Sequence, residues 1–472
     1  MRKSVCTFLL PFVIISLCLM PFRTSSAFTV GEEREVGEKL LYTVRTAFEI
    51  IDDPDIQQYI TKLGEEVIGV AGVQFFDYHF FIIKNKEFNA FAAPSGLIFF
   101  HSGLVEKVED ENELVSVIAH EIGHIAKRHI SSRIAKEKKI SVATLGMMLA
   151  SLALGGGAAT EALLAGSMAA GRSASLHFSR LDEEEADLLA YEWMKRLGRH
   201  PQGQVDMLKT MRQIARYRSG MIPQYLLTHP NPEARLDYVQ TLIASEAEEL
   251  QDFDTGEDFA FTRFKYRIMA ETKDSMSLRS YFSSVLASSR ADEFDMVMAK
   301  YGLSLLERAE NNYETSRRLL AEVIDRFGLR NELVIDRGLI EYESGETEKA
   351  YSTFASAYDR NRTDMYAAFS LAKASFQLGM LDKAHTLYRE VMYEMPEYAQ
   401  VYFELGRLSA AQGKAAEPKY YLGKYHLLQG KLDLAQHNLE IALAKDGLDG
   451  LDDLLAEDAE RSLELIARIQ KK

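Results

Sequence analysis

Cysteine is almost absent from this sequence of 472 residues, which contains only Cys6 and Cys18. Both lie in an N-terminal segment that we expect to be removed, so the mature chain should have no thiols and no disulfides. A chain of this length can form two or three domains and bury enough apolar surface to be stable without cross-links. Any metal site in the mature chain must therefore use histidine, aspartate and glutamate.

Basic residues are scarce relative to acidic ones, with 55 Lys and Arg against 70 Asp and Glu and a net charge of −15. Residues 1–27 hold three basic residues and no acid, so their removal leaves 52 basic residues against 70 acidic ones, a charge of −18. Nucleic-acid binding needs a cationic face that neutralises phosphates. The composition therefore argues against nucleic acid as a partner.

The apolar run at the N-terminus, Phe8–Met20, is shorter than the roughly 20 residues that a membrane-spanning helix needs. It follows a basic start and is followed by small residues up to Ala27, which is the pattern of a cleavable export signal. We expect Phe28 to begin the mature chain. An uncleaved anchor and a lipoprotein attached through Cys18 are the alternatives.

A second apolar stretch, Ile140–Gly171, is rich in alanine and glycine. Three glycines at Gly155–Gly157 break it and Glu161 interrupts it, so neither piece is long enough to span a bilayer. The pattern favours a buried helical hairpin, and a flap in peripheral contact with a membrane is the alternative.

Residues 117–129 read VIAHEIGHIAKRH, within an apolar helix that we expect to begin at Asp110. His120 and His124 project from one helix face and can reach one ion. Zinc in hydrolytic sites takes three protein ligands and leaves one position for water. Glu121 lies beside the ligands, where it can accept the proton of that water. The sequence predicts a hydrolytic site with one Zn²⁺ per chain and Glu121 as its catalytic base.

A third ligand is expected from the acidic helix Ser179–Met194, which reads SRLDEEEADLLAYEWM. Glu183 and Asp187 lie on one face of it, so Glu183 can bind zinc, and Asp187 is a catalytic residue expected to hydrogen-bond a ligand imidazole or the water and orient it. Spacing alone does not choose between Glu183 and Glu184. His129 lies off the helix face that carries the ligands. It is expected to be a packing residue or to contact a ligand side chain without binding the metal itself.

Two β-rich segments, residues 78–85 and 96–103, are expected to form strands joined by a loop that contains Pro94. If the second strand lies at a sheet edge beside the zinc, it could pair with an extended substrate backbone. A strand paired on both sides is the alternative. The expected substrate-strand residues are Gly96, Leu97, Ile98 and Phe99.

The C-terminal part of the chain repeats itself with a step of 34 residues, as Gly345, Gly379 and Gly413 show. Small residues keep the same step where paired helices would pack closest: Gly338, Ala372 and Gly406. This is the spacing of the tetratricopeptide repeat, whose stacked helix pairs form a concave surface that binds peptides or proteins. The pattern shifts by half a repeat near Gly430, which suggests that one helix packs as the repeat partner of both the helix before it and the helix after it. Residues 260–335 are expected to be helical, with degenerate repeats.

The His120–His124 pattern together with SRLDEEEAD at residues 179–187 resembles the metallopeptidase family of the CAAX prenyl protease and the heat-shock protease HtpX. In that family the glutamate four residues before the aspartate is the third zinc ligand. The resemblance therefore implies Glu183 as the third ligand and Asp187 as its accompanying acid.

Two further segments resemble parts of this family: residues 89–104 its strand upstream of the zinc helix, and residues 228–236 its later His-Pro segment. In relatives that also carry an export signal and tetratricopeptide repeats, the histidine of the His-Pro segment can occupy the open position of zinc and hold the enzyme off. The resemblance implies His229 as this regulatory fourth ligand.

These relatives work in the Gram-negative periplasm, and the resemblance implies a mostly α fold: an α+β zincin-like (gluzincin) domain with a small sheet, followed by an α-helical tetratricopeptide-repeat solenoid. It also implies a zinc endopeptidase that degrades unfolded or misassembled outer-membrane proteins, with the repeats contacting the barrel assembly machinery. The alternative is a chaperone or scaffold with a mostly latent metal site. The expected regions are a signal peptide (1–27), a metalloprotease domain (28–245), a helical linker or degenerate repeats (246–335) and a repeat domain (336–472).

Overall fold

The computed structural model describes residues 29–136, 178–217, 225, 228–250, 253, 259–444 and 450–470. The expected export signal and the apolar stretch at 140–171 lie outside these residues. Within the described residues, no helix combines the length and the apolar character that crossing a membrane requires. The described part of the chain is mostly α, with one small sheet, as the sequence predicts.

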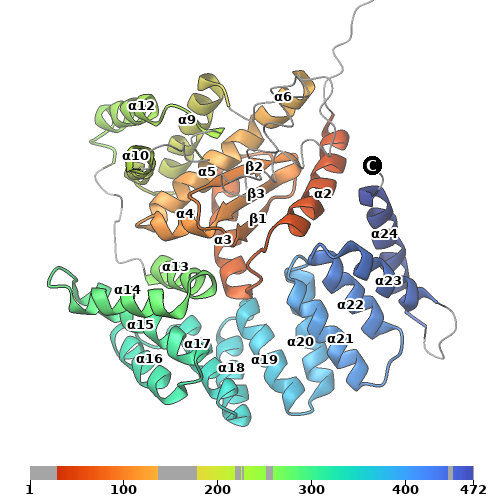
Figure 1. Cartoon of the computed structure of the whole chain (residues 1–472). Helices are drawn as coiled ribbons and strands as arrows, with labels where there is room; N and C mark the ends of the chain where they lie inside the picture. Colours follow the sequence, from red (N-terminus) through yellow and green to blue (C-terminus); the bar gives the residue numbers. More distant parts are fainter. Residues whose placement is uncertain are drawn as a thin grey trace, which may run out of the picture.

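The N-terminal half is built around a three-stranded sheet in the order β1-β3-β2 (Figure 1). Its elements are α2 (Val30–Ala47), α3 (Pro54–Ala71), β1 (His79–Ile83), β2 (Ala90–Ala93), the 3-10 turn η1 (Pro94–Gly96), β3 (Leu97–His101), α4 (Ser102–Lys107), α5 (Glu111–Ala126), α6 (His129–Lys136), α9 (Arg180–Arg196), α10 (Gln202–Tyr217) and α12 (Pro232–Ser245).

The sheet corrects two expectations from the sequence. The segment predicted to be only a loop contains the strand β2, because Ala90–Ala93 pairs antiparallel with β3 from Ala90↔Phe100 to Ala93↔Leu97. Strand β3 also pairs in parallel with β1, so it is the central strand and not an edge. The edge-strand role expected for Gly96, Leu97, Ile98 and Phe99 is therefore wrong, and β2 is the outer strand that packs against α5.

Helices cover both faces of this sheet, which explains why its strands are apolar at every position except His79 and His101. Side chains such as Phe81 and Phe99 join α2 in one buried cluster. Their neighbours Phe80, Ile98 and Phe100 join α3 and α5 in the main core on the other face. The buried helix α5 is thus held against the sheet as a rigid element.

The ends of α5 and α9 follow from their capping residues. The Asp110 side chain accepts a hydrogen bond from the Glu113 backbone N–H at 2.8 Å and caps α5 as predicted. Ser179 and Asp182 form a reciprocal capping box at the start of α9. The two helices approach closely at Gly123, where a Cβ would lie 3.2 Å from the Cα of Ala186.

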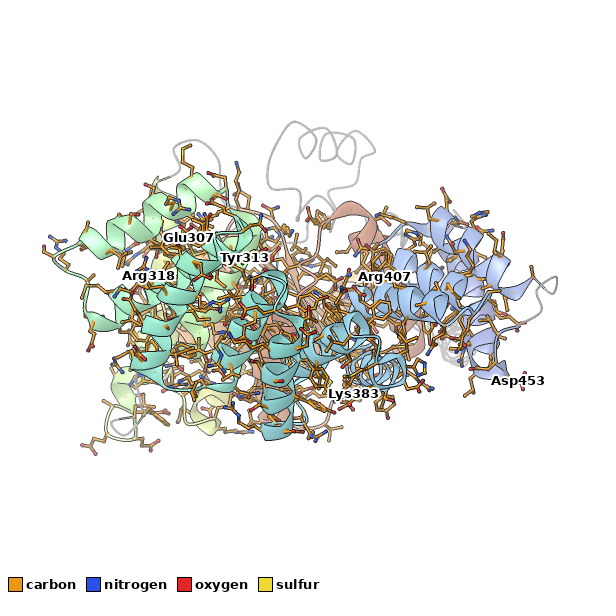
Figure 2. The ribbon with its side chains drawn as sticks, turned by 90° about the horizontal axis from the view of Figure 1, so that it is seen from below. Glu307, Tyr313, Arg318, Lys383, Arg407 and Asp453 are labelled. Atoms are coloured by element: carbon orange, nitrogen blue, oxygen red, sulfur yellow. The ribbon has the colours of Figure 1, made fainter. Side chains whose placement is uncertain are left out.

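The C-terminal half is a row of antiparallel helices. They are α13 (Phe259–Thr272), α14 (Ser275–Ala287), α15 (Glu293–Ala309), α16 (Tyr313–Phe327), α17 (Asn331–Glu343), α18 (Thr347–Arg360), α19 (Met365–Gln377), α20 (Leu381–Glu394), α21 (Ala399–Ala411), α22 (Glu417–Leu428), α23 (Leu432–Leu443) and α24 (Asp453–Gln470). Figure 2 shows this row from below, with Arg318 of α16 toward one end and Asp453 of α24 at the other.

The glycines that mark the repeat step lie in the turns between paired helices. Gly345, Gly379 and Gly413 have φ angles of 89°, 76° and 79°, which non-glycine residues adopt only at a cost. Gly430 continues the series half a repeat later, with a φ of 70° in the turn between α22 and α23. Because α22 packs against both α21 and α23, one helix serves two neighbours, as the half-repeat shift predicts.

The repeat helices curve beneath the N-terminal half and contact it at several places (Figure 1). Helix α3 packs on α19 and α13, and α2 packs on α22 and α24. The backbone N–H groups of Ala399 and Gln400, at the start of α21, donate to the carboxylate of Asp52 at 3.2 and 3.1 Å. Part of the surface expected to bind partners is therefore covered by the chain's own N-terminal half.

A buried charge network joins the two halves. Arg263 and Arg267 of α13 donate to the carboxylate of Asp336 in α17 at 3.0–3.2 Å. The same guanidinium groups reach back to Asp53 and Asp55 at the start of α3, at 2.6–2.8 Å. Burial alone would raise the pKa of Asp336, but Arg263 and Arg267 outweigh it and hold that pKa below its usual value. Two hydroxyls complete the shell of Asp336, those of Tyr301 and Tyr366.

Replacing Asp336 with asparagine should lower the free energy of unfolding by about 1.5–3 kcal/mol, since charged hydrogen bonds in a buried site are lost. Asp359→Asn is the matched control, because Asp359 forms an exposed surface pair whose contribution is about 0–1 kcal/mol. Urea unfolding followed by circular dichroism measures both. Equal midpoints for the two variants would show that the network does not stabilise the junction.

Candidate metal centre

Helix α5 places two imidazoles side by side in the core. His120 and His124 are four residues apart, and their Nε2 atoms are 3.0 Å from each other. Both rings are buried, and His124 has no exposed surface. Burial, the largest influence, lowers the pKa of His124 well below its ordinary value and keeps the ring neutral. A neutral imidazole with a free nitrogen is the form that binds a metal ion.

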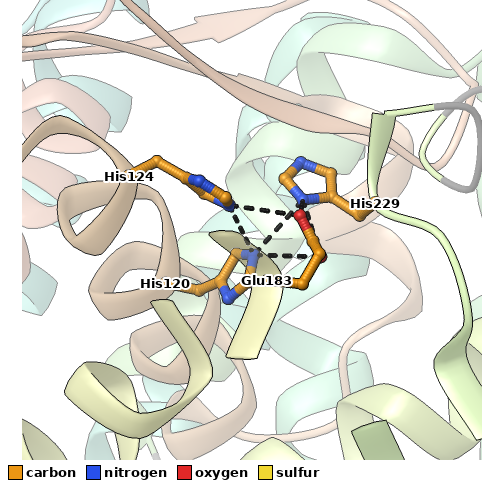
Figure 3. A group of neighbouring side chains, drawn as sticks. All are labelled: His120, His124, Glu183 and His229. Atoms are coloured by element: carbon orange, nitrogen blue, oxygen red, sulfur yellow. Dashed lines mark hydrogen bonds and ion pairs between the residues drawn. The ribbon is translucent and has the colours of Figure 1, made fainter. Parts of the chain in front are cut away.

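Glu183 of α9 and His229, from the segment before α12, complete a group of four donors (Figure 3). The Glu183 carboxylate lies 3.4 Å from His124 Nε2 and 3.7 Å from His120 Nε2. His229 Nδ1 lies 3.2 Å from His120 Nε2 and 3.0 Å from Glu183 Oε1. Glu184, the other candidate from the sequence, is exposed and outside this group.

The geometry and chemistry of this group fit a divalent metal ion. Four donors placed tetrahedrally at about 2.0–2.1 Å from zinc are about 3.3 Å apart, close to most of the separations found here. Burial, the largest single influence, lowers the pKa of His229, but the carboxylates of Glu183 and Glu121 together outweigh it and raise that pKa, so positive charge is favoured at the position of His229.

Glu121 is fully buried, and neither of its carboxylate oxygens has a hydrogen-bond partner among the described residues. His229 Nε2 lies 3.4 Å from Glu121 Oε1 and likewise has no hydrogen-bond partner among the described residues. Leaving a buried carboxylate without a hydrogen bond is costly. This cost is explained if the Glu121 carboxylate accepts a hydrogen bond from a water molecule and lies beside a bound cation.

Asp187 lies behind the donors and not among them. Its Oδ1 is 2.9 Å from His120 Nδ1, the nitrogen that faces away from the group. This contact places the His120 proton on Nδ1 and leaves Nε2 free to bind a metal. From the sequence, Asp187 is expected to be a catalytic residue with the role of orienting a ligand imidazole or the water. Its contact with His120 fits the first of these roles, so Asp187 is a positioning residue.

Arg235 is a site residue whose role the sequence did not reveal. It donates from Nε and Nη2 to the two oxygens of Asp187, each at 2.7 Å, and its Nη1 lies 2.7 Å from Glu183 Oε2. Burial would raise the pKa of Asp187, but Arg235 and His120 outweigh it and lower that pKa to about 2. The only indication in the sequence was that Arg235 lies within residues 228–236, the segment that resembles the His-Pro segment of the family. The spacing of residues could not show which acids Arg235 contacts.

A buried donor set of three histidines and a glutamate, beside a second glutamate that has no hydrogen-bond partner among the described residues, is typical of a metallopeptidase centre. Residues 54–243, which contain all four donors, match the model of Peptidase family M48.

The chain is similar to the beta-barrel assembly-enhancing protease of Escherichia coli K12, with 28% identity over 443 residues that cover 90% of this chain and 86% of that protein. The metalloprotease LoiP of the same organism is 26% identical over 168 residues, which cover 34% of this chain and 61% of LoiP. Among solved structures, the tetratricopeptide-repeat protein YrrB matches with a TM-score of 0.28 and 17% identity, covering 43% of this chain and 97% of YrrB.

Proposed function

We propose that this chain is an exported zinc endopeptidase that degrades unfolded or misassembled outer-membrane proteins in a Gram-negative periplasm. The observation that carries the proposal is the buried group of His120, His124 and Glu183 beside Glu121, whose carboxylate has no hydrogen-bond partner among the described residues. The name of the similar Escherichia coli protein, a beta-barrel assembly-enhancing protease, supports the substrate class. The repeat helices support binding of protein partners, among them the barrel assembly machinery.

His120, His124 and Glu183 would hold one zinc ion. When bound, zinc supplies a Lewis acid that polarises the scissile carbonyl and lowers the pKa of water. Glu121 takes the proton of the attacking water and delivers it to the leaving amine. Asp187 holds His120 in the tautomer that presents Nε2, and Arg235 balances the charges of Asp187 and Glu183.

The test of this function is cleavage by the purified chain. An unfolded outer-membrane β-barrel protein and casein should both be cleaved, a chelator should abolish the cleavage, and added zinc should restore it. Cleavage that persists without metal would contradict the proposal.

The contacts of His229 support a regulatory role for this residue at the centre. Its Nδ1 stands where a fourth ligand would bind, and its Nε2 faces Glu121. Its backbone N–H donates to the Tyr225 carbonyl at 2.7 Å, and its ring stacks on the Tyr225 ring at 4.4 Å between centroids. We propose that water and substrate reach the centre only when His229 moves away.

His229→Ala should therefore raise the rate of cleavage. If the closed state exceeds the open state by ten to one, the gain is about tenfold, because apparent activity scales with the open fraction. His437→Ala is the control, since His437 is exposed on α23, in the repeats. A rate that falls or stays unchanged in His229→Ala, with normal zinc content, would contradict a gating role.

The alternative function is a chaperone or scaffold in which the repeats act and the metal centre is mostly latent. An experiment in cells distinguishes the protease from the chaperone or scaffold. If Glu121→Gln abolishes function in outer-membrane assembly, the chain acts as a protease; if that function persists, the scaffold reading holds.

A further inference from the structure

His129 contacts a candidate metal ligand from outside the group of four donors. Its Nδ1 lies 2.9 Å from Nδ1 of His124, the nitrogen that faces away from the other ligands. On its other side, His129 Nε2 lies 3.0 Å from Glu185 Oε2. His129 is 7% exposed, so its contact with His124 is shielded from water, whereas Glu185 is an exposed carboxylate at the surface.

A break in the helix makes this contact possible. On one continuous helix, His129 would point about 140° away from His124, five residues earlier. Helix α5 ends at Ala126, and Arg128 adopts the left-handed region with a φ of 54° before α6 begins. The Arg128 guanidinium is held by Glu33 of α2 at 2.8 and 3.2 Å. The break turns His129 back onto the ring of His124.

The proton positions follow from the role of His124. To offer Nε2 to a metal ion, His124 must carry its proton on Nδ1, and that N–H needs an acceptor. Among the described residues, His129 Nδ1 is the acceptor within hydrogen-bond distance of that nitrogen, at 2.9 Å, so the His129 proton lies on Nε2 and is donated to Glu185. In the same way, the Asp187 carboxylate accepts the Nδ1 proton of His120 directly.

We propose that His129 is a positioning residue that fixes His124 in its metal-binding tautomer and orientation, with Glu185 as its anchor. This inference rests on the proposed metal-dependent function. It assigns the two histidine ligands different supports: a buried carboxylate for His120, and an imidazole linked to a surface carboxylate for His124.

The sharpest test compares His129→Asn with His129→Leu. The two side chains have similar size and shape, and the Oδ1 of asparagine can stand where Nδ1 stands and accept the His124 proton. Competition against a chromophoric chelator gives the zinc affinity of each purified full-length variant. His129→Leu should weaken zinc binding by about 10–100-fold, whereas His129→Asn should stay within about threefold of the wild type.

Circular dichroism and thermal unfolding of the metal-free proteins show whether both variants fold equally. Equal zinc affinities for His129→Leu and His129→Asn, whether both normal or both weak, would overturn the role of the acceptor. Glu185→Ala should weaken zinc binding more than Glu184→Ala, and equal effects would overturn the role of Glu185 as anchor. A wild-type protein that binds no zinc would instead refute the proposed function itself.

Discussion

Glu121→Gln is expected to lower kcat/KM for cleavage of an unfolded protein by about 10²–10⁴-fold, the usual contribution of a general base. Glutamine has nearly the same shape, so the loss should come from proton transfer and not from packing. Glu121 is not among the four donors, so zinc content should stay at one ion per chain. Cleavage assays at fixed pH, with metal analysis of the same samples, measure both quantities.

Glu184→Gln is the matched control for this experiment, since Glu184 is exposed on α9 and lies outside the donor group. It should keep wild-type activity. If Glu121→Gln retains activity within a few-fold of the wild type, Glu121 is not the base and the assignment of the centre fails.

Arg235→Met should destabilise the protein by about 3–5 kcal/mol, because it leaves the buried carboxylates of Asp187 and Glu183 without their cation. The deficit should be smaller in the zinc-loaded protein, where the ion compensates Glu183. Chemical unfolding of the metal-free and zinc-loaded forms measures the difference. Arg216→Met, which removes an exposed pair with Glu233, should cost about 0–1 kcal/mol.

The effect of Arg235→Met should also depend on pH in a defined direction. The pKa of Asp187 is lowered to about 2 in the folded protein, against about 3.9 for an unperturbed aspartate. A lowered pKa contributes stability that is complete above the unfolded value and is lost as pH falls through the folded value. The gap between wild type and variant should shrink from about pH 4 to about pH 2. A gap that is constant with pH would contradict the Asp187–Arg235 pairing.

Local patterns predicted much of the fold and the core of the site. The spacing of His120 and His124 is a property of one helix, and the Asp110 cap and the glycines of the repeat turns are equally local. Glu183 required a second helix, whose approach depends on the small residues Gly123 and Ala186.

Other features depend on three-dimensional contacts that the spacing of residues in the sequence does not predict. Strand β2 is four residues long and precedes a proline, so its pattern resembled a loop, and its pairing made β3 central. From the sequence, His129 is expected to point away from the site, because no local pattern predicts the left-handed backbone conformation of Arg128. The pairing of Arg235 with Asp187 joins residues 48 positions apart, and the link from Arg263 to Asp336 spans 73. Such contacts are set by packing of whole elements.

The most direct test of the central claim is the coordination shell of the metal in crystals of the purified protein, located by anomalous scattering at the zinc edge. The proposal predicts one zinc per chain bound by His120 Nε2, His124 Nε2 and Glu183, with His229 Nδ1 as fourth ligand in the closed state. A zinc ion bound elsewhere, or bound without Glu183, would contradict it.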